Sequence, residues 1–320
     1  MDQPMVVVEK VTKRYGTFKA VSDVSFSVPA GQIVGFLGPN GAGKTTTMKI
    51  ITGFMPPTDG TVRIDGFDVF DDSMELKQRI GYLPEHPPLY MDMIVSDFLQ
   101  FAAELRNVPS GQIKSAVDKA IELAGLEQVA DRIVGNCSKG YRQRVGIAQA
   151  LVHSPKVLIL DEPTVGLDPV QIVEIRELIK SLAGERTVIL STHILPEVSA
   201  TCERIIMITA GKIVGDGTEE DLWKKIAGAE RFHLAAKGRA EEVSNTLLQL
   251  ESVASLEDGA MEGDICHIEI VAKEGVDPRE EISIALAKKE LPVYELKPPG
   301  LTLEEVFVRL TTGEEGTKSK

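Results

Sequence analysis

The sequence has few of the features that mark secreted, membrane-spanning or nucleic-acid-binding proteins. It holds 3 cysteines in 320 residues, far apart and without metal-site spacing, so we expect reduced thiols in a cytosolic protein. No apolar run approaches the roughly 18 residues of a membrane span, and the N-terminus lacks the blocks of a signal peptide. The net charge of −13 argues against a general nucleic-acid binder, which needs a basic surface. Any membrane role therefore requires a separate membrane protein.

One segment of the chain carries a specific chemical signal. Residues 38–45 fit G-x-x-x-x-G-K-[ST], between an apolar run that predicts a strand (32–37) and a run that predicts a helix (46–51). Glycines let the backbone amides wrap phosphates, and the helix N-terminus adds partial positive charge. The lysine reaches the terminal phosphates and the threonine hydroxyl ligates Mg²⁺. The predicted nucleotide contacts are Gly38, Pro39, Asn40, Gly41, Ala42, Gly43, Lys44, Thr45 and Thr46.

A second signal follows the apolar run 157–160, which is typical of a central parallel strand. This run ends in Asp161 and Glu162. Hydrolytic phosphoryl transfer needs a phosphate cradle, a metal and a group that orients the attacking water. We therefore predict that Asp161 holds Mg²⁺ through its water shell and that Glu162 acts as general base or positions the water.

The order of predicted elements indicates an α/β fold followed by a smaller domain. Strands alternate with helices through the first part, which predicts a mostly parallel core sheet. Antiparallel strands and a hairpin at 61–69 precede a helical block at about 93–150. After about residue 228 the order β-α-β-β-α-β predicts a ferredoxin-like α+β domain. A last helix with Leu303, Val306, Phe307 and Leu310 and a loose tail at 311–320 complete the chain.

Two further segments narrow the choice among phosphate-loop proteins. Residues 137–144 (CSKGYRQR) precede the buried strand, residues 163–169 (PTVGLDP) follow it, and His193 ends the next strand. With these in order, the sequence resembles the ATP-binding subunits of ABC transporters from about residue 5 to 228. The resemblance implies a phosphate-loop ABC cassette at 1–228 with a helical signature subdomain. The accessory α+β domain then spans 229–310 and the flexible tail 311–320.

The resemblance also implies roles for individual residues. Tyr15 would stack on the adenine ring, since a flat aromatic face binds any base. Ser138 and Gly140, in a signature segment that also contains Lys139 and Tyr141, would contact the γ-phosphate of ATP held by a second subunit. Asp168 would lie in the loop that crosses this dimer interface. His193 would hydrogen-bond the γ-phosphate and help to hold the attacking water.

The sequence departs from the family pattern at two of these positions. The signature usually reads L-S-G-G-Q, whereas this chain has Lys139 in place of the first glycine. This lysine either adds charge near a γ-phosphate or faces solvent, and we favour solvent. Glu85 stands where the family usually has a glutamine that touches Mg²⁺ and signals to the membrane partner. We expect Glu85 to remain a contact of the metal's water shell and to make metal dependence steeper.

The most specific hypothesis is therefore an ATPase that uses ATP and Mg²⁺ and closes as a dimer around two ATP molecules. Its partners would be a second copy or a homologous subunit and an integral-membrane permease, which would hold it at the cytoplasmic face of the membrane. No nucleic-acid partner is expected. The segments 138–144 and 301–307 are similar to those of export-type and gliding-motility-type ATPases with separately encoded permeases. One alternative is a soluble single-cassette ATP switch of the same superfamily. The other is a metabolic kinase with the same phosphate loop, but a kinase would leave the signature and His193 unexplained.

Overall fold

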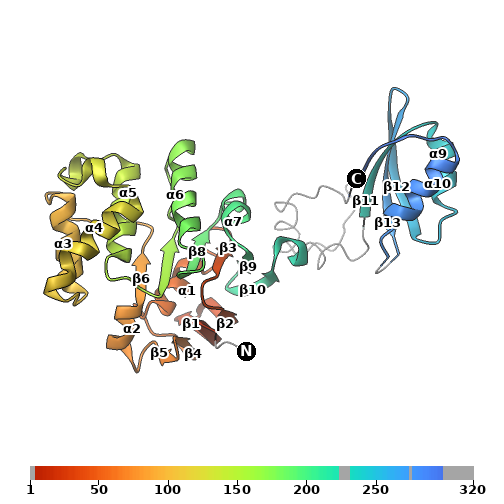
Figure 1. Ribbon diagram of the computed structural model, residues 1–320. Helices are drawn as coiled ribbons and strands as arrows, with labels where there is room; N and C mark the ends of the chain where they lie inside the picture. The colour runs from red at the N-terminus through yellow and green to blue at the C-terminus, as the bar shows by residue number, and fades with distance from the viewer. Residues whose placement is uncertain (1–3, 223–230, 274–275, 298–320) are drawn as a thin grey trace. The chain divides into compact units, whose positions relative to one another are not determined.

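Three sheets organise the residues described in this computed structural model, which are 4–222, 231–273 and 276–297 (Figure 1). Two of the sheets belong to a first unit, residues 1–219, and the third to a second unit, residues 220–320. The first unit contains every site residue predicted from the sequence.

An antiparallel sheet with the strand order β2-β1-β4-β5 is built from the early part of the chain. The predicted hairpin turn is confirmed between β4 and β5. Asp65 and Gly66 both have positive φ, at 52° and 83°, as a type I′ turn requires. The strands are β1 (Val6–Tyr15), β2 (Phe18–Val28), β4 (Asp59–Ile64) and β5 (Phe67–Asp68).

The central sheet has the order β10-β9-β3-β8-β7-β6, and all neighbours except β10 and β9 are parallel. The predicted mostly parallel core is therefore confirmed. In β7, Val157 and Ile159 pack towards the antiparallel sheet and α1, while Leu158 and Leu160 pack towards α5 and α6. Burial on both faces explains the continuous apolar run. The strands are β3 (Ile33–Leu37), β6 (Ile80–Leu83), β7 (Val157–Asp161), β8 (Thr187–Thr192), β9 (Arg204–Thr209) and β10 (Lys212–Gly217).

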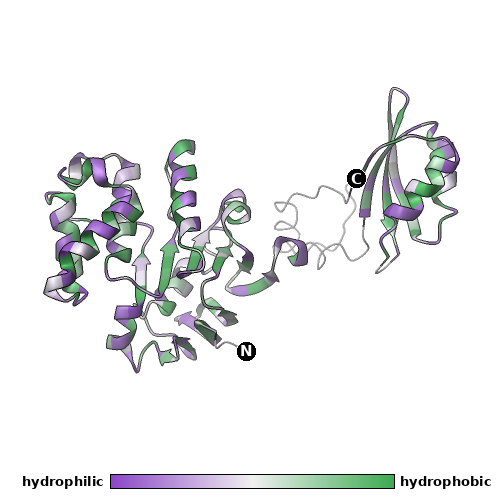
Figure 2. Ribbon diagram, in the orientation of Figure 1, coloured by the Kyte–Doolittle hydropathy of each residue, from purple (hydrophilic) through white to green (hydrophobic). Residues whose placement is uncertain are grey.

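The helical block predicted at 93–150 is present, and α3, α4 and α5 share a core of their own. Figure 2 shows hydrophilic and hydrophobic residues side by side along these helices, as their amphipathic sequences require. From the sequence, α2, α7, β9 and β10 were not predicted; the two helices are seven residues long, which is fewer than two helical turns and shows no clear period. The helices are α1 (Lys44–Ile51), α2 (Ser73–Arg79), α3 (Val95–Leu105), η1 (Ser110–Gln112), α4 (Ile113–Ala124), η2 (Glu127–Val129), η3 (Val134–Asn136), α5 (Lys139–Leu151), α6 (Pro169–Ser181) and α7 (Leu195–Thr201).

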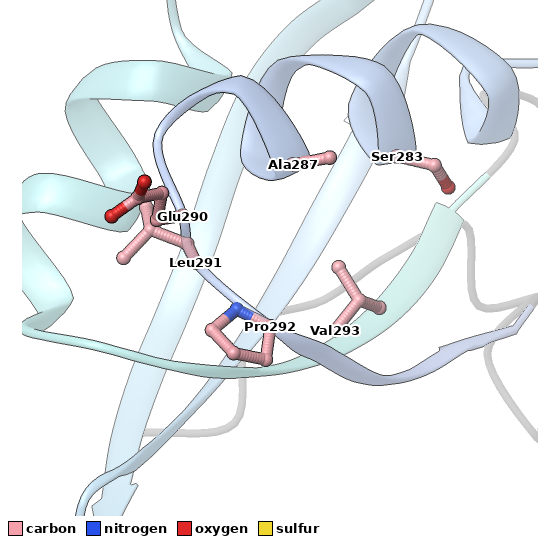
Figure 3. A pocket seen from close by; sticks show the side chains of 6 residues that line it. All are labelled: Ser283, Ala287, Glu290, Leu291, Pro292 and Val293. Atoms are coloured by element: carbon pink, nitrogen blue, oxygen red, sulfur yellow. The ribbon is translucent and has the colours of Figure 1, made fainter.

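The second unit has the predicted β-α-β-β-α-β order, and its sheet has the antiparallel strand order β12-β13-β11-β14 of ferredoxin-like domains. Figure 3 shows a pocket at the end of α10 and the start of β14, lined by small and apolar side chains and Glu290. The predicted helix at 303–310 and the tail at 311–320 lie outside the described residues. The elements are β11 (Arg231–Lys237), α9 (Ala240–Leu247), β12 (Val253–Glu262), β13 (Ile265–Ala272), α10 (Arg279–Lys288) and β14 (Val293–Lys297).

The three cysteines, Cys137, Cys202 and Cys266, are free thiols. Within the described ranges, every helix is too short or too polar to cross a bilayer.

Candidate functional site

The phosphate loop predicted at 38–45 connects the end of β3 to the start of α1. Gly38 has no room for a side chain, because a Cβ there would lie 2.4 Å from the Ile208 carbonyl oxygen. Gly43 has a φ of 106°, and a Cβ there would lie 2.6 Å from the Ala20 carbonyl oxygen. Both glycines are therefore required by the close approach of neighbouring backbone as well as by the turn itself.

Lys44, the first residue of α1, directs its ammonium group back under this loop. Its Nζ donates hydrogen bonds to the carbonyl oxygens of Gly38, at 2.9 Å, and Pro39, at 3.3 Å. The same Nζ lies 3.2 Å from Oε1 of Glu162, and both side chains are 6% exposed. The lysine thus links the loop to the end of β7. Of the other predicted loop contacts, Ala42 is buried, Thr45 and Thr46 are half-buried, and Asn40 and Gly41 are exposed.

Asp161 ends β7 and is fully buried. Its Oδ1 accepts hydrogen bonds from the hydroxyls of Ser191 and, at 3.5 Å, Thr45. Its Oδ2 is buried and has no hydrogen-bond partner among the described residues. Burial is the main cause that raises the pKa of this carboxyl group, opposed by its hydroxyl donors. A carboxylate oxygen left unpaired beside a threonine hydroxyl is a donor set that suits a hard divalent cation such as Mg²⁺.

Glu162 and His193 form a direct pair beside this carboxylate. Oε2 of Glu162 lies 2.9 Å from Nδ1 of His193, while Oε1 faces Lys44. Glu162 has a φ of 51°, uncommon for a non-glycine residue, and its N–H donates to the Ser191 carbonyl at 2.9 Å. Such backbone geometry costs energy and persists only where the surrounding structure holds it. Sequence reasoning predicted both residues, and the structure brings them together.

Glu85 lies two residues beyond β6, next to the end of β7, because Leu83 pairs with Leu160. Its side chain is exposed, and its charge is one of the smaller causes that raise the pKa of Asp161. Tyr82 was not predicted as part of this site. Its hydroxyl is buried without a hydrogen-bond partner among the described residues, and burial, followed by the charges of Asp161 and Glu85, raises the pKa of Tyr82.

The signature segment lies at the start of α5. Ser138 caps this helix, since its hydroxyl accepts from the Tyr141 N–H at 3.3 Å. Gly140 is buried against α6, where a Cβ would lie 2.6 Å from the side-chain carbon of Gln171. The Tyr141 side chain packs on the core of the helical block. These contacts run to α5, α6 and the helical block, so a role on a second subunit's ATP stays a prediction.

The loop 163–169 contacts the signature segment through Lys139 and leads into α6 at Asp168. Lys139 is exposed, yet its ammonium lies against Gly166, where a Cβ would be 1.9 Å from Nζ. Gly166 itself has a φ of 71°. Asp168 caps α6, its Oδ1 accepting from the Gln171 N–H at 2.9 Å. The signature and the loop that ends at Asp168 are therefore packed together as one surface.

Tyr15 ends β1 with its side chain half-exposed. Its hydroxyl donates to the Met55 sulfur at 3.2 Å, and the Lys13 ammonium lies 5.6 Å from the ring centroid. An exposed aromatic ring on this edge is compatible with base stacking, and the role of Tyr15 stays a prediction.

Besides Tyr82, three polar residues of the site were missed because they carry no motif of their own. Ser191 and Thr192 end the apolar strand β8, and Glu197 lies on α7. The signal that could have revealed the first two is a pair of hydroxyl residues at the carboxyl end of an otherwise apolar strand. The hydroxyls of Thr192 and Thr164 both donate to the buried carboxylate of Glu197.

Comparisons with known proteins agree with this arrangement. The family model described as ABC transporter matches residues 21–165. A second model, described as an AAA domain and putative AbiEii toxin of a type IV toxin–antitoxin system, matches residues 135–200. These two ranges together contain the phosphate loop, the signature segment, Glu162 and His193.

Individual relatives extend the similarity beyond the cassette. The bacitracin transport ATP-binding protein BcrA of Bacillus licheniformis is 39% identical over 232 residues, 72% of this chain and 75% of its own length. The linearmycin resistance ATP-binding protein LnrL of Bacillus subtilis is 31% identical over 308 residues, 96% of this chain and 98% of its own. A solved dimeric ATP-binding cassette in a post-hydrolysis state with ADP and Pi has a TM-score of 0.61 and 28% identity, over 67% of this chain and 98% of its own.

Proposed function

The chain belongs to the family of ABC transporter ATP-binding proteins, and from this premise we propose that it closes as a twofold dimer to drive a separate membrane permease. It is an ATPase of this family. One observation carries the catalytic part of the proposal above all. Lys44, Asp161 and the pair of Glu162 and His193 converge where β3, β7 and β8 end, which is where α/β proteins bind ligands.

We propose that Thr45 and Asp161 hold Mg²⁺ with the ATP phosphates, and that Glu85 contacts its water shell. When bound, the metal neutralises phosphate charge and orients the γ-phosphate. The unpaired Oδ2 of Asp161 and the nearby Thr45 hydroxyl support this assignment. The exposed Glu85 would add negative charge to the same place.

The contacts of Lys44 suggest how ATP changes the site. Its ammonium is shared between two loop carbonyls and Glu162. A triphosphate in the loop competes for this ammonium, because charge-assisted hydrogen bonds to phosphate are stronger than those to neutral carbonyls. Glu162 would then be released to accept a proton from the attacking water. His193, 2.9 Å from Glu162, would orient that carboxylate and the water.

The dimer is proposed because the contacts of the signature residues Ser138 and Gly140 run along α5 and to Gln171 of α6, whereas the side chains of Lys44 and Glu162 bond to the phosphate loop, to each other and to His193. Ser138 and Gly140 would contact ATP in the partner, with Tyr15 stacking on adenine. The dimeric cassette similar to this chain supports the arrangement. The relatives include an ATP-binding protein named for bacitracin transport, which favours a transport motor over a soluble ATP switch.

We also propose that the domains span residues 1–228, 229–310 and 311–320, and that the chain is attached to the cytoplasmic face of the membrane through the permease.

Cell fractionation tests the proposed permease partner. The full chain, expressed at native level with a small tag, is expected in the membrane fraction together with one multi-span protein. The membrane-bound complex should hydrolyse ATP with Mg²⁺. Removal of that membrane protein's gene should release the chain into the soluble fraction. A chain that sediments with ribosomes, or stays soluble while the membrane protein is present, would reject the transport motor.

Substitution of Glu85 with glutamine should raise the Mg²⁺ concentration needed for half-maximal hydrolysis. One carboxylate fewer near Asp161 weakens attraction for the cation, by about two- to fivefold for a partly solvated charge. The measurement is an ATPase titration with Mg²⁺ at saturating ATP. Glu127→Gln, another exposed carboxylate, is the matched control and should leave the curve in place. If the two variants titrate alike, Glu85 has no role at the metal.

A further inference from the structure

Glu197 carries a buried carboxylate with both oxygens in use. The residue lies on α7 and is 3% exposed. Its Oε1 accepts from the Thr164 hydroxyl at 2.5 Å and its Oε2 from the Thr192 hydroxyl at 2.9 Å. No cation within the described ranges forms an ion pair with it. A charge buried in this way is costly and is retained only where hydrogen bonds satisfy it.

The two threonines are close in sequence to Glu162 and His193, the pair at the proposed reaction centre. Thr164 follows Glu162 by two residues, and Thr192 directly precedes His193. The Thr192 hydroxyl also accepts from the Ile194 N–H at 3.0 Å, which holds the turn from β8 into α7. Glu197 thus ties the segment that carries Glu162 to the strand end that carries His193.

We propose that Glu197 is a positioning residue, which fixes the distance between Glu162 and His193 by bridging Thr164 and Thr192; the inference rests on the proposed hydrolytic role of Glu162. The physical reason is twofold. Glu162 holds an unfavourable positive φ that persists only if its surroundings determine it. The pair of Glu162 and His193 also joins two separate segments, and a misplacement of about 1 Å at a reacting centre can cost roughly 100-fold in rate.

The experiment compares variants of the bridge in the full chain. Thr164→Val removes one hydroxyl donor of the bridge, Glu197→Gln replaces one accepting oxygen and the negative charge with an NH2 group that can only donate, and Thr164→Ser keeps the hydroxyl. Glu203→Gln, an exposed carboxylate just past α7, is the matched control. The readouts are kcat and KM for ATP with Mg²⁺, nucleotide affinity from a fluorescent ATP analogue, and Tm.

We expect Thr164→Val and Glu197→Gln to lower kcat by about tenfold or more, with nucleotide affinity and KM within about twofold of the parent. Thr164→Ser should restore kcat to within about threefold, and Glu203→Gln should match the parent. An unchanged kcat would overturn the proposal, whatever happens to Tm. So would a parallel loss of kcat, affinity and Tm that serine does not rescue, because that describes general unfolding.

A double variant separates this inference from the proposed function. If Glu197 acts through Glu162, then Glu197→Gln should cause no further loss of residual turnover in a Glu162→Gln background. If Glu162→Gln alone leaves hydrolysis intact, the proposed hydrolytic role of Glu162 fails. If Glu162→Gln abolishes hydrolysis and the bridge variants do not lower it, only the positioning role of Glu197 fails.

Discussion

Substitution of Glu162 with glutamine is expected to stop steady-state ATP hydrolysis while ATP still binds. The amide cannot accept a proton from water, and loss of a general base typically costs about 10²- to 10⁴-fold in rate. Glutamine has the same shape, so its carbonyl oxygen can still accept from Lys44, and the phosphate loop should keep its geometry. Phosphate release measures turnover, and a fluorescent ATP analogue measures binding.

The same variant should accumulate as a dimer in ATP and Mg²⁺, because we propose that hydrolysis reopens the closed dimer and this variant does not hydrolyse ATP. Size-exclusion chromatography with light scattering reports the mass. Glu203→Gln is the control, and should hydrolyse ATP and elute like the parent. Hydrolysis by Glu162→Gln at the parent rate would remove Glu162 from the proposed catalytic role.

Substitution of Lys44 with alanine is expected to weaken ATP binding by about 100-fold, since a charge-assisted hydrogen bond to phosphate contributes up to about 3 kcal/mol. The substitution also changes the protein without ATP. Glu162 loses its cation and keeps only His193, which leaves a buried carboxylate less satisfied. Isothermal titration with ATP and Mg²⁺ measures the affinity.

The matched control is Lys49→Ala, five residues further along α1, where the ammonium lies 5.7 Å from the centroid of the Phe54 ring. This control separates loss of the phosphate contact from loss of any lysine in the helix. An affinity of Lys44→Ala within about threefold of the parent would contradict the proposed phosphate contact, since that difference is under 1 kcal/mol.

The parts of the fold that depend on residues close together in the sequence could be predicted. Asp65 and Gly66 identified the hairpin because a type I′ turn needs positive φ at both positions. The alternation of apolar residues identified the strands of the second unit, and their order identified its topology. Short elements such as α7 escaped, because fewer than two helical turns show no clear period.

The site residues also fall into two groups, those that a local sequence pattern identifies and those that only contacts between distant segments reveal. Spacing alone identified the phosphate loop, and the end of an apolar strand identified Asp161 and Glu162. The hydroxyl of Thr45 reaches Asp161 across 116 residues of sequence, and that of Thr164 reaches Glu197 across 33. No local pattern encodes such distances, so the burial of Tyr82 and the bridge at Glu197 could not be foreseen.

By itself the sequence therefore determined the chemistry: a loop that binds phosphates, a carboxylate suited to a metal, and a glutamate next to it. These depend on residue type and on backbone conformations that neighbouring residues impose. Only the tertiary structure decided which groups meet. The parallel pairing of β3, β8 and β7 brings three strand ends to one edge of the sheet, and this places Lys44, Glu162 and His193 in contact. The rate and geometry of any reaction depend on that contact, because charges act over a few ångströms in space and not over positions in a chain.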